Sequence, residues 1–470
     1  MNKYYLGIDL GSTTSKAVII NESDEIIGRG ITNTRANYKV AANIAREEAI
    51  YDARFTLLAK ELNKDIKAHP EIKRYMDDIR AIFQYRQFKY RMDSLSKELK
   101  KTAKNFKYDN TEAIVVKLDE ILQTIVPQIR HDFVEGDLGS KNQFFRDIVS
   151  QRYNEEVSKI NKEFFEPLML AFDKSITPVE NEMMLFNFKD LIHESMQVLE
   201  EKYEGIAEKV AKKNYVEKDP DLNLLKDNYK DVANKIQTLI NEIANEEINI
   251  ANMVGTGYGR ALLPFPEESI KSEILCHAFG AHAVFPMTRT VLDIGGQDTK
   301  AIQVDAHGLV TSFHMNDRCA AGCGRYLGYI ADEFSLSLNE LGPETLLADH
   351  ETTICSTCTV FAGAEMRELL NVGEKKSNIL AGLHKAIVQR AMSLIARSGG
   401  VRNEFTFTGG VARNQAVLKY VKQMVAESYG SDIKMNIHPD SIFMGALGGA
   451  MFARRNIEID LPDSKTKVTA

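Results

Sequence analysis

The sequence predicts an α/β protein of two similar lobes, with a large α-helical insertion inside the first lobe. The main observation is a repeat, because residues 8–18 (IDLGSTTSKAV) return as residues 292–302 (LDIGGQDTKAI). Each copy predicts a buried strand, a tight turn and a second strand. The second observation is a change of texture, because residues 37–246 are rich in Lys, Glu, Asp and Leu, contain no Cys and show helical periodicity.

The first lobe begins with three predicted strands, over residues 4–10, 16–20 and 25–32. The insertion then predicts an antiparallel bundle with coiled-coil-like hairpins, because amphipathic patterns cover residues 41–62, 75–103, 144–165 and 229–245. Two interpretations of the insertion have equal support: a spacer with solvated charged faces, or a docking arm for a partner subunit. It contains no catalytic constellation.

The α/β texture resumes with a predicted strand at 248–254, followed by the glycine-rich turn 255–260, which is weak evidence by itself. Further elements are helices at 268–279 and 383–397, the second ending at Gly399, and a strand at 404–408. A helix is expected from the Gly409–Asn414 turn to 428 and a last one at 441–455, whose Gly445, Gly448 and Gly449 permit close packing or ligand approach. The predicted parts are 1–36 and 248–290 for lobe I, 37–247 for the insertion, 291–440 for lobe II, and 441–470 for the last helix and a loose tail.

Composition excludes several classes of protein. The net charge of −7 with a pI near 5.9 argues against non-specific nucleic-acid binding. No apolar run reaches the roughly 20 residues of a membrane span. The strand that starts near Tyr4 leaves no room for a signal peptide. We therefore expect a cytoplasmic protein with reduced cysteines.

The two hairpins together predict a nucleotide clamp. Gly11 and Gly295 let backbone N–H groups approach an anion closely, and the hydroxyls of Ser12 and Thr13 add donors. An Asp at each strand end is suited to hold a divalent cation through water. A third motif supports this interpretation, because the strand–Gly–Gly–helix turn at Thr408–Asn414 lets a base or ribose lie against the backbone near a helix N-terminus.

All five cysteines lie in the C-terminal half, at positions 276, 319, 323, 355 and 358, which indicates a metal or redox site. Cys319 and Cys358 each precede a predicted helix, whose N-terminus favours a thiolate and an anionic cluster. Three interpretations remain open. Four cysteines bind one zinc ion or iron–sulfur cluster within the chain; Cys319 and Cys358 contribute to a cluster shared with a second subunit; or all are buried structural thiols.

In order, Asp9–Lys16, Asp293–Lys300 and Thr408–Asn414 resemble the phosphate-1, phosphate-2 and adenosine motifs of the superfamily of acetate and sugar kinases, heat-shock chaperones and actin. The resemblance covers the chain outside the insertion. It implies a duplicated ribonuclease-H-like ATPase fold that binds ATP and Mg²⁺ between its lobes. A fold alone does not choose among kinase, chaperone and motor functions.

The cysteine motifs narrow this resemblance. The segments Asn316–Gly322 (NDRCAAG) and Cys358–Ala362 (CTVFA), with Thr256–Arg260 (TGYGR), are similar to those of 2-hydroxyacyl-CoA dehydratase activators and of the ATP-binding subunits of benzoyl-CoA reductase. That family implies one [4Fe–4S] cluster between two subunits, with Cys319 and Cys358 as this chain's ligands. Cys323 and Cys355 depart from the family motif and keep the single-chain site open, while Cys276 is expected to be a buried structural thiol.

Residues 32–38 and 45–49 resemble the opening of the insertion in the benzoyl-CoA reductase subunit, which favours that member over the shorter dehydratase activators. The resemblance implies an ATP-driven electron donor in anaerobic aromatic degradation. Reduced ferredoxin loads the cluster, and ATP changes the angle between the helices that begin at Cys319 and Cys358. The electron then passes to a catalytic iron–sulfur subunit that binds the acyl-CoA. The cluster's other half comes from a shorter homologous subunit or a second copy of this chain.

The implied roles follow residue by residue. Asp9 and Asp293 position Mg²⁺, Gln297 orients the attacking water, and Lys16 either neutralises phosphate or is solvated. The phosphates lie between Gly11, Ser12 and Thr13 on one side and Gly295 and Gly296 on the other; Gly409, Gly410 and Asn414 border the adenosine, and Arg413 stacks on the base or covers the helix. Two alternatives remain: a homodimeric activator of a 2-hydroxyacyl-CoA dehydratase, and a small-molecule kinase or chaperone-like ATPase with structural zinc.

Overall fold

The computed structural model describes residues 2–34, 37–65, 70–106, 110–136, 138–140, 144–184, 186–212, 237–243, 247–260, 265–317, 319, 322–354 and 358–455. The chain forms two compact units. One consists of Met1–Ala49 and Asn249–Ala470, and the other of Ile50–Ile248. The predicted tail after residue 455 and Cys355 lie outside the described residues.

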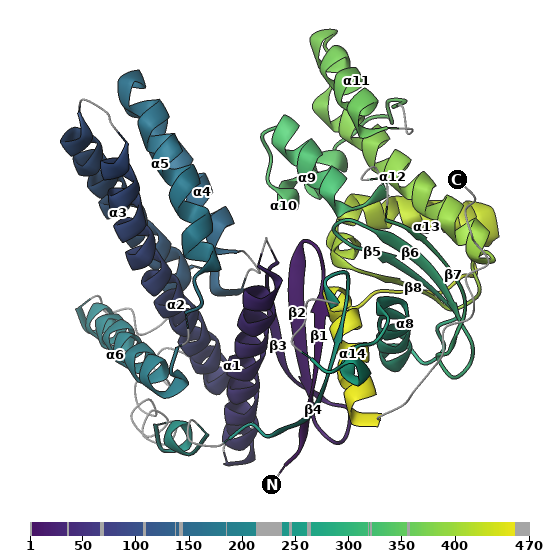
Figure 1. Ribbon diagram of the computed structural model, residues 1–470, viewed down its shortest axis with the longest axis horizontal. Coiled ribbons are helices and arrows are strands. Elements are labelled where there is room, and N and C mark those ends of the chain that lie inside the picture. The colour runs from purple at the N-terminus through teal and green to yellow at the C-terminus, as the bar shows by residue number, and fades with distance from the viewer. Residues whose placement is uncertain are drawn as a thin grey trace. The chain divides into compact units, whose positions relative to one another are not determined.

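The first unit contains two sheets with the same strand order, which confirms the predicted α/β fold of two similar lobes (Figure 1). The lobe I sheet has the order β3-β2-β1-β4, and the lobe II sheet has the order β7-β6-β5-β8-β9. Lobe I uses Tyr4–Leu10 (β1), Thr14–Ile20 (β2), Ile26–Asn33 (β3) and Ile250–Thr256 (β4). Lobe II uses Thr290–Ile294 (β5), Thr299–Val304 (β6), Val310–Asn316 (β7), Phe405–Thr408 (β8) and Met435–Asn436 (β9).

The duplication extends to the register of the strands. Asp9 lies opposite Lys16 on antiparallel β2 and opposite Thr256 on parallel β4. Asp293 lies opposite Lys300 on β6 and Thr408 on β8 in the same way. The sequence repeat is therefore a repeated four-strand unit, in which each Asp is the last residue but one of its strand, β1 or β5.

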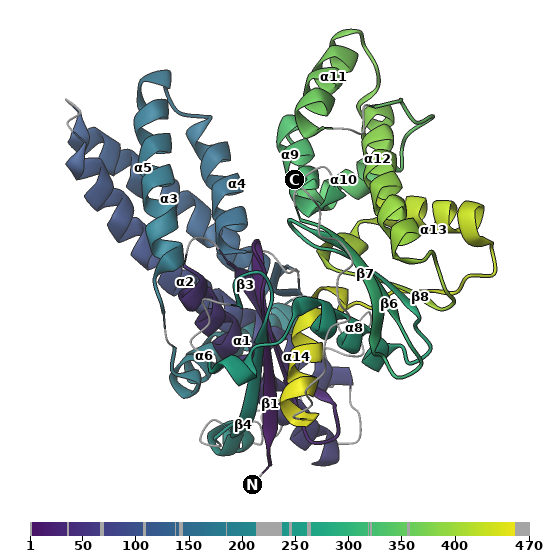
Figure 2. The ribbon, with the colours of Figure 1, turned by 45° about the vertical axis from the view of Figure 1, so that its right-hand side comes forward.

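Two helices, Glu273–Val284 (α8) and Met444–Arg455 (α14), pack against each other in one core with residues of both sheets (Figure 2). The close approach of α14 requires glycine. An added Cβ at Gly448 would collide with the carbonyl oxygen of Cys276, and one at Gly7 would collide with that of Ala446. The sequence allowed two roles for the glycines of α14, close packing or close approach of a ligand. For Gly448, the structure shows close packing.

The remaining helices of lobe II are Gly324–Glu333 (α9), Leu338–Thr345 (α10), Thr359–Asn371 (α11), Lys376–Ser398 (α12) and Gln415–Tyr429 (α13). Helix α12 starts earlier than predicted and ends, as predicted, at Gly399, which has φ +118°. Its length and apolar composition are compatible with a membrane span, but 67% of its apolar window is buried inside the structure. It packs against β6, β7 and α13, so its apolar character is that of a core helix.

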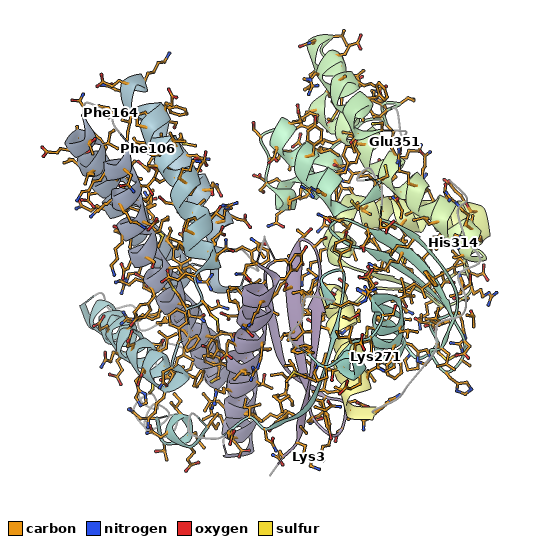
Figure 3. The ribbon with its side chains drawn as sticks, viewed as in Figure 1. Lys3, Phe106, Phe164, Lys271, His314 and Glu351 are labelled. Carbon is orange, nitrogen blue, oxygen red and sulfur yellow. The ribbon has the colours of Figure 1, made fainter. Side chains whose placement is uncertain are left out.

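The second unit is helical. Its helices are Tyr38–Asp65 (α1, which begins in the first unit), Pro70–Asn105 (α2), Thr111–Val134 (α3), Phe145–Val157 (α4), Lys162–Asn181 (α5) and Phe188–Lys212 (α6). Phe55, Phe83 and Phe188 form one core, and Phe106 and Phe164 pack against another, near the end of the helical hairpins (Figure 3).

Two helices predicted within the insertion, at 144–165 and 229–245, need separate comment. The single helix expected at 144–165 is wrong, because a turn after Val157 divides it into α4 and α5. Asn161 takes the N-cap position of α5, in an extended backbone conformation that ends helical continuity (φ −53°, ψ 141°). Of the helix expected at 229–245, residues 237–243 are described and are helical.

Candidate functional site

A buried Asp–Lys pair stands at the same place in each lobe. Lys16 Nζ lies 3.2 Å from Asp9 Oδ2, and Lys300 Nζ lies 3.4 Å from Asp293 Oδ2. Burial alone raises the pKa of each carboxyl, but the neighbouring cations outweigh it, so both pKa values are below the usual range. Both carboxylates thus stay ionised inside the protein. The solvated alternative for Lys16 is wrong.

His277 lies between these two carboxylates and was not singled out in the sequence. From α8, its Nδ1 lies 3.2 Å from Asp293 Oδ1, and its Nε2 lies 3.9 Å from Asp9 Oδ2. Burial lowers the pKa of His277, but Asp293 outweighs this and the pKa is raised. No local signal marked His277, because it is one residue of an almost continuously apolar helix.

The two predicted phosphate turns meet each other. An added Cβ at Gly296 would collide with the Thr13 side chain, so the turns touch at these two residues. Ser12 and Gln297 are partly exposed and Thr13 is exposed, which leaves their polar groups accessible to a ligand. The structure therefore brings together the predicted phosphate-binding residues of both lobes.

A fourth turn completes the symmetry. Gly257 follows Thr256 at the end of β4 with φ +93°, as Gly409 follows Thr408 at the end of β8 with φ +87°. An added Cβ at Gly257 would lie 2.6 Å from Asp9 Oδ1, so both the backbone conformation and the space require glycine. In the sequence, the Thr–Gly pair shared by Thr256–Gly257 and Thr408–Gly409 is the feature that marks the 255–260 turn as the counterpart of the Thr408–Asn414 motif.

Asn414 has a structural role in the third motif. Its Oδ1 accepts hydrogen bonds from Ala416 N (2.9 Å) and Val417 N (3.1 Å), which makes it the N-cap of α13. Its Nδ2 lies 3.2 Å from His384 Nε2. The turn before it, Gly410–Arg413, is a 3₁₀ helix and not the start of α13. Arg413 Nη2 donates to Pro439 O (3.2 Å). This contact favours the interpretation in which Arg413 covers the helix surface over the one in which it stacks on the base.

The cysteine-bearing loop is bonded directly to the second phosphate turn. Gly324 N donates to Gly295 O (2.9 Å), and Arg325 N donates to Gly296 O (2.7 Å). Thr299 Oγ1, on the strand after the turn, donates to Gly322 O (2.5 Å). The loop that contains Cys319 and Cys323 therefore shares one hydrogen bond with the phosphate hairpin, and the first turn of α9, directly after Cys323, shares two.

The thiols differ in position and access. Both cysteine segments precede a helix, as predicted: α9 begins at Gly324 and α11 at Thr359. Cys323 is the N-cap of α9, and Cys358 is the N-cap of α11. Cys319 lies earlier in the loop, partly exposed, and Arg390 Nη1 donates to its Sγ (3.3 Å). Cys323 is buried, which raises the pKa of its thiol, and Cys276 is buried as expected.

These groups fit the ligands that the sequence implies. Two ionised carboxylates, one on each side of His277, suit Mg²⁺, which binds one or two carboxylates and keeps several waters. Cys319 and Cys358 are the two described cysteines with solvent access, and the guanidinium of Arg390 lies beside Cys319. Within the described residues, no group of three or more His, Cys, Asp or Glu side chains gathers as a metal site.

Comparison with known proteins agrees with this geometry. A model of the BadF/BadG/BcrA/BcrD ATPase family matches residues 6–453. The chain belongs to this ATPase family. The match includes both phosphate hairpins, the cysteine motifs and the helical insertion.

Individual relatives of this BadF/BadG/BcrA/BcrD ATPase are of two kinds. The 2-hydroxyisocaproyl-CoA dehydratase activator of Clostridioides difficile is 39% identical over 211 residues, 45% of this chain and 76% of the relative. A benzoyl-CoA reductase subunit of Thauera aromatica is 32% identical over 176 residues, 37% of this chain and 62% of the relative. The crystal structure of (R)-2-hydroxyglutaryl-CoA dehydratase component A of Acidaminococcus fermentans superimposes with a TM-score of 0.50 at 20% identity, over 97% of this chain and 98% of that chain, and confirms the duplicated ATPase fold.

Proposed function

We propose that this ATPase is an ATP-driven electron activator of an enzyme that reduces or dehydrates an acyl-CoA. The observation that carries the proposal is the pair of hydrogen bonds from the first turn of α9, directly after Cys323, to the carbonyls of Gly295 and Gly296. A change at the phosphate turn moves the acceptors of those bonds. ATP binding and hydrolysis are therefore coupled to the position of the loop that contains Cys319.

In the ATPase step, Asp9 and Asp293 would hold Mg²⁺, which would supply positive charge to neutralise the phosphates. The facing turns at Thr13 and Gly296 enclose the phosphates with backbone and hydroxyl donors. Lys16, held beside Asp9, adds positive charge, and Gln297 orients the attacking water. Assay of Asp293→Asn tests this assignment, since near-normal ATPase activity would contradict the role of Asp293.

For electron transfer, Cys319 and Cys358 supply two thiolates to a [4Fe–4S] cluster. A shorter homologous subunit or a second copy of this chain supplies the other two, and reduced ferredoxin in the cytoplasm is the electron source. The cluster carries one low-potential electron when bound. Raising one electron by about 59 mV costs about 1.4 kcal/mol, so coupling to ATP hydrolysis is physically sensible.

Two acceptors have specific support. The higher identity to a dehydratase activator, 39% against 32% for the reductase subunit, favours a 2-hydroxyacyl-CoA dehydratase. The resemblance of residues 32–38 and 45–49 to the opening of the reductase insertion favours benzoyl-CoA reductase. A co-purifying shorter homologue with ATP-dependent reduction of benzoyl-CoA supports the reductase, whereas a homodimer that activates a dehydratase supports the first acceptor.

The decisive experiment is anaerobic purification followed by iron, sulfide and zinc analysis. One [4Fe–4S] cluster per two homologous subunits, lost from both Cys319→Ser and Cys358→Ser variants, is the expected result. A complete cluster or one zinc ion in each isolated chain would contradict the shared site. It would favour the alternative in which Cys323 and Cys355 are also ligands.

A further inference from the structure

Helix α12 contacts both the third nucleotide motif and the cysteine site. We propose that α12 transmits the nucleotide state to Cys319, with His384 and Arg390 as the positioning residues at its two contacts. The inference rests on the proposed function, because it assigns the route by which ATP acts on the thiol. It adds a side-chain route to the backbone bonds at Gly295 and Gly296.

His384 forms the contact with the nucleotide motif. It is fully buried, and its Nδ1 lies 2.8 Å from Leu380 O, a bond that requires the proton on Nδ1. Its Nε2 therefore accepts a hydrogen bond from Asn414 Nδ2 (3.2 Å). Burial lowers the pKa of His384 to about 4, so the imidazole stays neutral and keeps this acceptor. Because Asn414 also caps α13, a shift of the Gly409–Arg413 turn is passed to α12.

Arg390 forms the contact with the cysteine. Its Nη1 donates to Cys319 Sγ at 3.3 Å. An added Cβ at Gly322 would lie 3.9 Å from Arg390 Cβ and Cδ, so the loop also packs along the arginine side chain. Movement of α12 therefore displaces both a charged donor and a packing surface from Cys319.

The connection between the two contacts is rigid. His384 and Arg390 lie in one unbroken helix, with a rise of about 9 Å between them. The segment that leads toward Cys358 is attached to the same helix, because Asp349 N donates to Asn378 Oδ1 (2.9 Å) and Lys385 Nζ lies 2.7 Å from Glu351 Oε2 (Figure 3). One helix thus joins the third nucleotide motif to Cys319 and to the segment that contains Asp349 and Glu351.

The test uses the full-length, reduced, cluster-free chain. The rate of iodoacetamide alkylation of Cys319 is measured by peptide mass spectrometry with ADP and with a non-hydrolysable ATP analogue. We expect the two rates to differ about fivefold or more, the lower end of usual coupling between sites. In the His384→Leu and Arg390→Met variants, we expect the ratio of the two alkylation rates to fall toward one. In Arg390→Lys, which keeps the positive charge, we expect a ratio between that of Arg390→Met and that of the wild-type chain. The backbone bonds of Gly295 and Gly296 remain in all variants, so the loss reports on α12.

A matched control is Arg397→Met, the same substitution at an exposed arginine of the same helix, which keeps the wild-type ratio. Nucleotide affinity and circular dichroism of each variant show that lost binding or misfolding is not counted as lost coupling. If the two variants keep the wild-type ratio of alkylation rates, the inference is wrong and the proposed function stands. If the wild-type chain binds ATP but Cys319 is alkylated at the same rate with both nucleotides, the coupling itself is absent, and both the inference and the proposed function are wrong. A chain that binds no ATP overturns both.

Discussion

Replacing Lys300 with Met should be strongly destabilising. The side chain is 3% exposed, and its Nζ lies 2.8 Å from Asp298 Oδ1, 3.4 Å from Asp293 Oδ2 and 3.6 Å from Glu273 Oε1. Methionine has a similar length, so the packing loss is small. The three carboxylates, however, lose their shared cation. Removing one partner of a buried ion pair costs about 3–5 kcal/mol, and we expect a loss of that size in the free energy of unfolding.

The matched control is Lys16→Met in the other lobe. Lys16 is 12% exposed and, among the residues that the structure describes, forms an ion pair only with Asp9, at 3.2 Å, so we expect a smaller loss, about 1.5 kcal/mol. Urea unfolding of the nucleotide-free chains, followed by far-ultraviolet circular dichroism because the chain has no Trp, measures both variants. In mild acid, the difference in free energy of unfolding between Lys300→Met and the wild-type chain should become smaller, because protonation removes the charge of the carboxylates that have lost their cation.

The reasoning would be refuted if Lys300→Met lost less than about 1 kcal/mol, the value typical of exposed pairs. A large loss that is the same at all pH values would point to packing, not to charge, as its cause.

Three further predictions concern the same unit. Gly257→Ala, at φ +93° and with its new Cβ 2.6 Å from Asp9 Oδ1, should cost about 1–3 kcal/mol and lower ATPase activity, whereas Gly328→Ala, with open space around it, should do neither. Burial raises the pKa of Cys276 to about 12, so native-state alkylation at mildly alkaline pH should spare Cys276 and modify Cys358; equal rates would show that α8 is not packed as described. Because the pKa of His277 is raised in the folded chain, its contribution to stability is complete below about pH 6.5 and is lost as the pH rises through the folded pKa. His277→Asn should therefore show less decline of the urea midpoint between mildly acidic and mildly alkaline pH, and an unchanged slope would contradict this.

Much of the fold followed from local patterns. Strand β1 begins and ends where its apolar run predicts, and the repeated Asp–x–Gly turns identify both hairpins. Helix α12 ends at Gly399 for the reason that the sequence shows, a residue that accepts a left-handed backbone. These features depend on residues close together in the chain, so periodicity and turn chemistry are enough to recognise them.

Other features came from contacts between segments far apart in sequence. His277 faces Asp9 and Asp293 because α8 packs against β5 and against α14, which in turn packs on β1, and no pattern around His277 encodes those partners. The register of β4 on β1 likewise makes Gly257 the counterpart of Gly409. The residue types and spacing thus specified the strands, the motifs and the family resemblance. The polar contacts that join the motifs depend on how the two lobes pack, because side-chain distances are set by tertiary neighbours and not by sequence spacing.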